Sequence, residues 1–221
     1  MAASKALTEE HLVVLKDRAL AEVEKYLAAD HVWSTVREES AGVTYKSCRH
    51  PGHGMDVFYW GKKIQVSLQT LQDYLWASTK ESVQEFDPDT LEWEFRTVGE
   101  FRVISQLSKL GWPIWNRSFV TAWFVHRASE QRVIMLYFSV ADPEYPEKPK
   151  DNVRGTVTFM GEALTQQADG SALFERVMHV DPAGNLPAAL VNRLAGREVI
   201  GFLNHVEKKL VHWEKTRKEK S

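Results

Sequence analysis

The chain has 221 residues, of which 43% are hydrophobic and 26% charged, and its formal net charge is −2 at pH 7. These values are typical of a soluble globular domain, and the nearly neutral charge argues against a nucleic-acid-binding protein. The single cysteine, Cys48, excludes an intramolecular disulfide and indicates a reducing compartment. No apolar run approaches the ~20 residues that span a bilayer, so we expect a soluble, cytoplasmic protein.

The first predicted element is a helix over residues 8–29. Thr8 has a side chain that suits an N-cap, and Glu9 and Glu10 suit the positive end of the helix dipole. Apolar residues at helical spacing predict that one face of this helix is buried. They are Leu12, Leu15, Ala19, Val23 and Leu27.

Short β-like runs occupy most of the middle of the chain. Clusters of Gly, Pro, Asp and Asn separate them, and the connections are short, which predicts a mostly antiparallel sheet. One or two short helices are predicted over residues 69–86. The predicted strands are 42–48, 56–67, 91–97, 100–108, 117–127, 132–140, 152–160 and 172–181.

A long amphipathic helix is predicted after the last strand, over residues 187–214. The Asp-Pro-Ala-Gly run at 181–184 ends the strand, and Pro187 begins the helix where its missing N–H costs little. A sheet of this size must curve, and only this helix is long enough to cover its concave face. Its apolar stripe comprises Val191, Ala195, Val199, Phe202, Val206, Leu210 and Trp213. The layout is therefore α+β.

The sequence contains little that resembles a catalytic or metal site. Cys48, His50 and His53 are potential metal ligands, but their spacing fits no standard zinc pattern. The motifs of a nucleophile elbow, a metalloprotease helix, a phosphate-binding loop and a dinucleotide site do not occur in the sequence. We therefore predict no catalytic residue, no metal and no cofactor, and we expect that the protein is not an enzyme.

Four segments, in order along the chain, carry a resemblance to a known family. They are WSTVREESAGVTYK at 33–46, NRSFVTAW at 116–123, ADPEYPEKPKDNVRG at 141–155 and VDPAGNLPAALVNR at 180–193. These motifs resemble those of the START domain family, the steroidogenic acute regulatory protein-related lipid-transfer proteins. The last motif is quite specific, and together the four segments span nearly the whole chain.

This resemblance implies a helix-grip fold, in which a curved antiparallel sheet wraps around a long C-terminal helix and encloses a lipid cavity. It implies a single domain over residues 1–221 that binds and transfers one lipid without catalysing a reaction. We expect a lipid ligand, transient contact with a membrane surface, no nucleic acid and a monomer. Two alternatives stay open: a hydrolase or cyclase that uses the helix-grip cavity, and a sensor whose bound lipid changes partner binding.

The resemblance also implies which side chains line the cavity. Many family members carry an inward Arg on the strand 117–127, paired with an acid on the preceding strand. This chain has Trp123 at that position and no acid at 104–106, so we expect a wall without paired charge. The predicted lining residues are Gln106, Phe119, Thr121, Trp123, Val125, Thr156, Thr158, Val191, Ala195, Val199, Phe202 and Val206.

The same comparison of motifs bears on the choice of lipid. The phosphatidylcholine-transfer branch of the family uses three aromatic residues as a choline cage, and the matching positions here are Gln106, Phe119 and Thr158. Only one of these is aromatic, which weakens cation–π binding of choline. We therefore favour a sterol or another neutral lipid, with a glycerophospholipid or a fatty acyl lipid as the alternative.

The loop at 109–116 is unusually apolar because it contains Trp112, Ile114 and Trp115. These side chains either form a gate that touches the membrane or pack beneath the last helix. In both cases the loop has to move for a lipid to enter the cavity.

Overall fold

The chain begins with a helix, continues through a series of strands interrupted by two short helices, and has a further helix after the last strand. The structure is a computed structural model that describes residues 6–39, 42–110, 114–148, 150–184, 186–187, 191, 201–210 and 212. The helices are α1 (Glu9–Leu27), α2 (Leu68–Trp76), α3 (Lys80–Phe86) and, in the C-terminal helix, residues 201–210. The strands are β1 (Thr35–Glu39), β2 (Val43–Arg49), β3 (Asp56–Ile64), β4 (Thr90–Val98), β5 (Phe101–Ser108), β6 (Arg117–Ser129), β7 (Arg132–Ser139), β8 (Val153–Arg154), β9 (Thr156–Gln166) and β10 (Ala172–Asp181).

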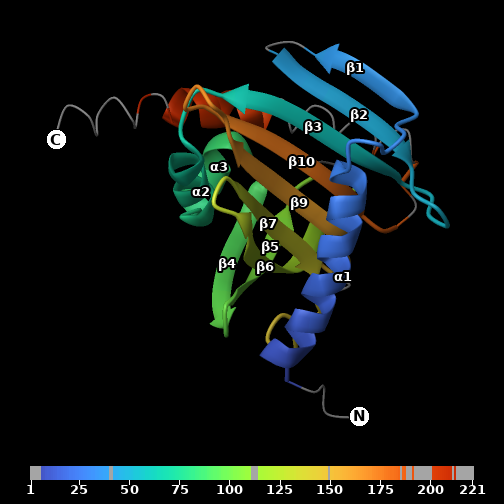
Figure 1. Cartoon of the computed structure of the whole chain (residues 1–221). Helices are drawn as coiled ribbons and strands as arrows, with labels where there is room; N and C mark the ends of the chain where they lie inside the picture. Colours follow the sequence, from blue (N-terminus) through green and yellow to red (C-terminus); the bar gives the residue numbers. More distant parts are fainter. Residues whose placement is uncertain are drawn as a thin grey trace.

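One curved sheet contains all of these strands (Figure 1). The strands are hydrogen-bonded in the order β1-β2-β3-β10-β9-β7-β6-β5-β4, and every neighbouring pair along this path is antiparallel. The short strand β8 pairs in parallel with the beginning of β6. Strands β1 and β4 form the two edges, so the sheet is not closed into a barrel.

Helix α1 packs across one face of the sheet, against β7, β9 and β10 (Figure 1). The side chain of Thr8 caps the helix, because it accepts a hydrogen bond from the backbone N–H of His11 at 3.4 Å. Leu12 and Val23 are fully buried in this contact. Gly161 on β9 permits the close approach, since a Cβ at that position would lie 2.4 Å from Cγ1 of Val23.

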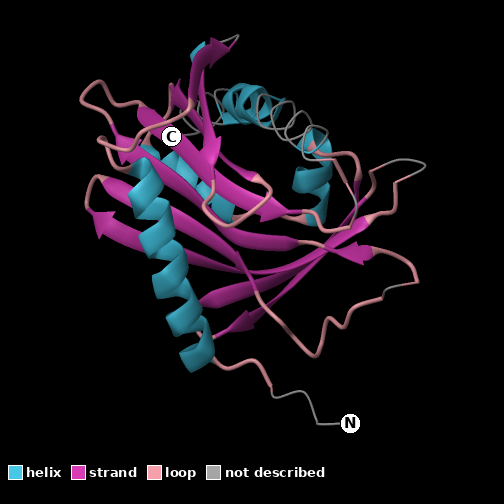
Figure 2. Ribbon diagram, turned by 90° about the vertical axis from the view of Figure 1, so that its right-hand side faces the viewer, coloured by secondary structure: helices cyan, strands magenta, loops and turns pink. Residues whose placement is uncertain are grey.

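The C-terminal helix and α2 cover the opposite, concave face of the sheet (Figure 2). The buried apolar side chains of the C-terminal helix are Phe202, Leu203, Val206 and Leu210. Lys62 on β3, which is 5% exposed, donates hydrogen bonds to the carboxylate of Glu207 at 2.7 Å and to Oδ1 of Asn204 at 3.3 Å. The helix is therefore held to the sheet by apolar contacts and by an ion pair whose lysine is buried.

This architecture is the predicted α+β helix-grip fold, a curved sheet with a helix against its concave face. The predicted helix at 8–29 is found as α1. The predicted strand at 152–160 is too short, because β9 continues to Gln166. Strand β1 is absent from the predicted strands. Its side chains are mostly exposed, so they show no alternation of buried and exposed positions. Within the predicted helix 187–214, Val191, 201–210 and His212 are helical, and the other positions from 188 onward lie outside the described residues.

Candidate functional site

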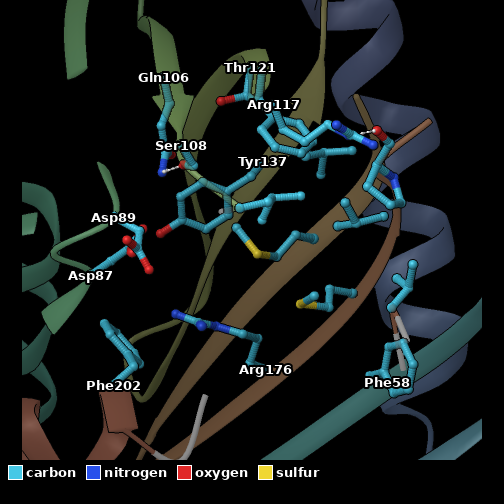
Figure 3. A pocket seen from close by; sticks show the side chains of 18 of the residues that line it. Phe58, Asp87, Asp89, Gln106, Ser108, Arg117, Thr121, Tyr137, Arg176 and Phe202 are labelled. Carbon is cyan, nitrogen blue, oxygen red and sulfur yellow. Dashed lines mark hydrogen bonds between the residues drawn. The ribbon is translucent and has the colours of Figure 1, made fainter. Parts of the chain in front are cut away.

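A cavity of about 330 Å³ lies between the concave face of the sheet and the C-terminal part of the chain (Figure 3). Most of its wall is apolar, with a few polar groups, which is the composition typical of small-molecule sites. Several strands contribute to it, including β3 with Phe58, β9 with Met160 and β10 with Met178, and the C-terminal helix contributes Phe202. The cavity is therefore formed by the two layers that define the fold.

The structure brings part of the predicted lining together around this cavity. These residues are Gln106, Phe119, Thr121, Trp123, Val191 and Phe202. Three of them lie on β6, where alternate side chains point to the same face of the sheet. Trp123 packs edge-on against Tyr137, with 4.5 Å between ring centroids, and its Nε1 donates to the hydroxyl of Thr121 at 3.0 Å. The polar atoms of this indole and hydroxyl therefore satisfy each other within the wall.

Thr156 and Thr158, which were also predicted to line the cavity, are not among the residues that surround it in the structure. The pairing of β9 with β10 shifts register after His179, where a β-bulge reverses the alternation of side chains. Val157 and Met160 face the cavity in place of the two threonines. Both threonines are exposed, and Oγ1 of Thr158 lies 3.0 Å from Nδ1 of His179.

Two further predicted residues lie away from the cavity. Val125 lies farther along β6 and lines a separate hollow beside Trp76. Val206 is fully buried in the core beneath the C-terminal helix and is not among the residues that line the cavity. Ala195 and Val199 fall outside the described residues.

One side of the cavity is polar. Gln106 donates hydrogen bonds from Nε2 to the hydroxyls of Thr90 at 3.2 Å and Ser108 at 3.1 Å. Thr90 in turn donates to the carboxylate of Asp87 at 2.7 Å. Figure 3 shows Gln106, Ser108, Asp87 and Asp89 on the same side of the pocket. These hydrogen bonds fix the orientation of the Gln106 amide.

A buried ion pair is built into the wall, which contradicts the expectation of a wall without paired charge. Arg176 on β10 pairs directly with Glu162 on β9, and its Nε and Nη2 both donate to Oε1 of that carboxylate, the first at 3.0 Å. Tyr137 on β7 donates to the other carboxylate oxygen, Oε2, at 2.6 Å. Burial and the neighbouring carboxylate raise the pKa of Tyr137 well above its ordinary value. Both oxygens of Glu162 are thus engaged.

The sequence contains a signal for this ion pair. Residues 167–171 connect β9 to β10, and pairing Gln166 with Ala172 places Glu162 opposite Arg176. Opposite charges at directly paired positions stabilise an antiparallel ladder. The predicted strand ends at residue 160 and therefore does not include Glu162. Because β9 was predicted too short, the ion pair between Glu162 and Arg176 was not predicted either.

Arg117, at the beginning of β6, ties together two segments beside the cavity. Its Nε donates to the carbonyl of Pro182 at 2.6 Å and its Nη2 to that of Ala183 at 3.2 Å, while Nη1 donates to the carbonyl of Trp115 at 2.5 Å. Burial lowers the pKa of this guanidinium. Ala183 has a positive φ of 57° and Gly184 one of 72°, so the Asp-Pro-Ala-Gly run forms a tight turn that Arg117 holds against the loop before β6.

The predicted gate is only partly described. Ile114 is half-buried and the side chain of Trp115 is 54% exposed, whereas Trp112 lies outside the described residues. From the same loop, Lys109 and Leu110 line the cavity. Among the helices that the structure describes, none is long and apolar enough to cross a membrane.

A group of histidines lies on the other face of the sheet, near α1. The ring centroid of His50 lies 4.8 Å from that of His53 and 4.4 Å from that of His179. Burial and these two imidazoles lower the pKa of His179 to about 4. Cys48 is also buried on this face, and burial raises the pKa of its thiol. No group of three His, Cys, Asp or Glu in the described part of the chain is arranged to hold a metal ion.

Comparison with known proteins agrees with this architecture. The family model of the START domain matches residues 14–216. Human StAR-related lipid transfer protein 5 superposes with a TM-score of 0.79 at 16% identity, covering 93% of this chain and 99% of that chain. Human STARD10 gives a TM-score of 0.72 at 19% identity, covering 99% of this chain and 85% of that chain.

A bacterial structure shows the same likeness. The STAR-related lipid transfer protein from Xanthomonas axonopodis superposes with a TM-score of 0.67 at 18% identity, covering 80% of this chain and 98% of that chain. At these identities, the similarity of the structures establishes the fold alone. No curated protein sequence matches the chain at a significant level.

Proposed function

Because the chain belongs to the START domain family, we propose that it is a non-enzymatic carrier that holds one neutral lipid in its cavity and transfers it between membranes. The observation that carries this proposal is the apolar cavity of about 330 Å³ between the sheet and the C-terminal helix. Its size falls in the range of small-molecule sites. The free Cys48 supports a cytosolic place of action.

A neutral lipid, with a sterol as the first candidate, agrees with the internal pairing of Arg176 in the wall. The guanidinium of Arg176 is already neutralised by Glu162. Of the three positions that correspond to a choline cage, Gln106 and Phe119 line the cavity and Thr158 does not. Only Phe119 is aromatic, which weakens cation–π binding of a cationic head at these positions. Glycerophospholipids and fatty acyl lipids are the competing ligands in the test below.

The polar group in the wall is better suited to holding a ligand than to acid–base catalysis. Both carboxylate oxygens of Glu162 accept hydrogen bonds, from Arg176 and from Tyr137. The pKa of Tyr137 is raised well above its ordinary value by burial and by that carboxylate. A general acid or base near neutral pH requires a pKa near the working pH. This argument favours a carrier over a hydrolase or cyclase.

Burial of the lipid tail supplies the binding energy. Each buried CH₂ contributes about 0.8 kcal/mol, so an acyl or sterol tail gains on the order of 10 kcal/mol on leaving water. The membrane offers a similar gain, so a carrier has to match the membrane's affinity for the lipid rather than exceed it greatly. Trp115, whose side chain is 54% exposed beside the cavity loop, is the described residue best placed to touch a membrane surface.

Transfer between vesicles tests this proposal. Donor vesicles of phosphatidylcholine carry either dehydroergosterol, a fluorescent sterol, or a fluorescent phosphatidylcholine, and acceptor vesicles carry a quencher. We expect the protein to accelerate sterol transfer at least tenfold over the spontaneous rate and phosphatidylcholine transfer much less. Acceleration of neither lipid would contradict a carrier of these lipids, and acceleration of phosphatidylcholine alone would contradict the preference for a neutral lipid.

Two substitutions of Trp123 test whether lipid transfer depends on the cavity. Trp123→Arg introduces a charge without an acid of its own into the apolar wall, at a cost of several kcal/mol, and should abolish sterol transfer. Trp123→Phe keeps an aromatic ring against Tyr137 and is the matched control, with at least half of the wild-type rate. Melting temperatures of both variants separate lost binding from lost folding.

A further inference from the structure

One terminal nitrogen of the Arg176 guanidinium, Nη1, takes no part in the ion pair with Glu162. Nε and Nη2 both donate to Oε1 of Glu162, whereas Nη1 has no hydrogen-bond partner among the residues that the structure describes. The side chain of Arg176 is 13% exposed and lines the cavity. Figure 3 shows it extending into the pocket. The two N–H donors of Nη1 are therefore available to a molecule in the cavity.

Neighbouring groups hold this guanidinium in one orientation. The ring of Phe202 lies over it, with 4.2 Å between the ring centroid and Cζ of Arg176. Its partner Glu162 is itself fixed by the 2.6 Å hydrogen bond from Tyr137. A donor that is already held in place loses little conformational entropy when a ligand binds.

We propose that Arg176 is the head-group receptor of the cavity and that it selects lipids whose head is an uncharged hydrogen-bond acceptor, such as a hydroxyl or carbonyl oxygen. This inference rests on the proposed carrier function. Glu162 already neutralises Arg176, so an anionic head would add an unbalanced negative charge beside a buried carboxylate. A neutral acceptor satisfies Nη1 and leaves the net charge of the cavity unchanged.

The surroundings of Arg176 provide an apolar place for the rest of the ligand. Phe58, Met160 and Met178 line the same cavity. Methionine side chains are flexible and adapt to irregular shapes, so either a fused ring system or an acyl chain fits beside them. Selection by Arg176 therefore acts on the head group and leaves the form of the tail open.

The test measures which lipids the protein extracts from one mixture. Phosphatidylcholine vesicles carry hexadecanol, hexadecane and hexadecanoate in equal amounts, together with cholestanol and cholestane, and mass spectrometry quantifies the lipids that remain with the protein. The selectivity is the ratio of bound alcohol to bound alkane. Because it is a ratio, it does not depend on the fraction of protein that is folded. We expect hexadecanol and cholestanol to exceed their alkanes at least tenfold, with hexadecanoate below hexadecanol.

Paired substitutions test the role of Arg176. The double variant Arg176→Met with Glu162→Gln removes both charges together, and its glutamine oxygen still accepts from Tyr137. We expect it to retain hexadecane and cholestane while the selectivity for the alcohols falls at least tenfold. The control is Arg96→Met with Asp142→Asn, because Arg96 donates to the fully buried Asp142 at 2.7 Å away from the cavity. This control should keep the wild-type selectivity.

The possible results separate this inference from the function on which it rests. Unchanged selectivity in the Arg176 double variant would show that Arg176 is not the head-group receptor, while the carrier function would stand. Enrichment of hexadecanoate over hexadecanol in the wild type would overturn the preference for an uncharged head. Extraction of no lipid, including phosphatidylcholine, by the wild type would overturn the carrier function and this inference together.

Discussion

The phenol of Tyr137 donates a 2.6 Å hydrogen bond to Glu162, and both residues are buried, at 3% and 2% exposure. The bond joins β7 to β9 and completes the set of partners around the carboxylate that pairs with Arg176. A buried carboxylate is tolerated only when its oxygens are satisfied. The fold of the concave face and the polarity of the cavity therefore depend on the same contact.

Tyr137→Phe should lower the free energy of unfolding by about 1–3 kcal/mol, because it leaves one oxygen of the buried Glu162 without its donor. Tyr59→Phe is the matched control: Tyr59 donates to Glu175 at 3.0 Å, but the side chain of Glu175 is 15% exposed and can recruit water. We expect the control to cost about half as much. Chemical denaturation of both variants measures the difference, and equal costs would contradict the special role of the buried carboxylate.

The organisation of the fold could be predicted from the sequence, because its signals are local. Thr8 and the apolar spacing after it indicate α1, and alternation on β6 places Phe119, Thr121 and Trp123 on the cavity face. Alternation failed where the backbone departs from a regular ladder. The bulge at His179 turned Thr158 away from the cavity, and a bulge leaves no clear pattern in one sequence.

The ion pair escaped prediction for a different physical reason. Gly161 and Glu162 look like the end of a strand, since glycine and buried carboxylates are rare inside strands. In the structure, Gly161 makes room for Val23 of α1, and Glu162 meets Arg176 across the ladder. The contact of Gly161 with Val23 joins distant parts of the chain, and spacing along the sequence does not reveal it. The pairing of Glu162 with Arg176 follows from the register of the β9–β10 hairpin, but only once β9 is extended past residue 160.

The contact of Gly161 with α1 predicts a compensating pair of substitutions. Gly161→Ala places a Cβ 2.4 Å from Cγ1 of Val23, and overpacking of this kind costs about 1–3 kcal/mol. Val23→Ala alone loses apolar packing. In the double variant the two effects should partly cancel, giving a coupling energy of about 1 kcal/mol. A double-mutant cycle by thermal or chemical denaturation checks this, and strictly additive costs would contradict the contact.

The stability of the protein should fall in mild acid because of His179. Its pKa is lowered to about 4 by burial, then by His50 and His53, against the opposing charge of Asp181. The unfolded chain, with an ordinary histidine pKa near 6.5, therefore binds more protons between about pH 4 and pH 6.5. The contribution of neutral His179 to the free energy of unfolding is therefore complete above about pH 6.5 and is lost as the pH falls toward 4. We expect a loss of about 2 kcal/mol, because solvent near the exposed His53 screens part of the effect.

Replacement of single histidines tests the source of this acid sensitivity. His179→Gln should flatten the dependence of unfolding free energy on pH between 4 and 6.5. His11→Gln, on the exposed face of α1, is the control and should leave the slope unchanged. An equally steep profile in the His179 variant would assign the acid sensitivity to other groups.

Truncation of Lys62 and truncation of Glu207, which form the ion pair between β3 and the C-terminal helix, should lower the free energy of unfolding by different amounts. Lys62 is 5% exposed, whereas the side chain of Glu207 is 33% exposed. Glu207→Ala leaves a buried ammonium with a single long contact to Asn204 and should cost about 3 kcal/mol. Lys62→Met leaves a carboxylate that water can reach, and should cost about 1 kcal/mol. Denaturant titrations compare the two, and the reverse order would contradict the burial of Lys62.

The loop before β6 should control the rate of transfer rather than the amount of lipid bound. Ile114→Ser with Trp115→Ser removes two apolar side chains of this loop that do not line the cavity, and we expect sterol transfer to slow at least fivefold with equilibrium loading nearly unchanged. Salt should have little effect, because the contact is apolar. Packing beneath the helix predicts instead a lower melting temperature and a rate that falls only in step with unfolding.

The central claim is that the cavity holds one neutral lipid, and the measurement that tests it most directly is native mass spectrometry of the protein purified from cells. Chloroform extraction of the same sample identifies the bound molecule. We expect one ligand per chain, with an apolar tail and an uncharged hydroxyl or carbonyl head. A protein that emerges without any lipid, even after incubation with vesicles of mixed sterol and phospholipid, would contradict the claim, and so would an anionic phospholipid as the main bound species.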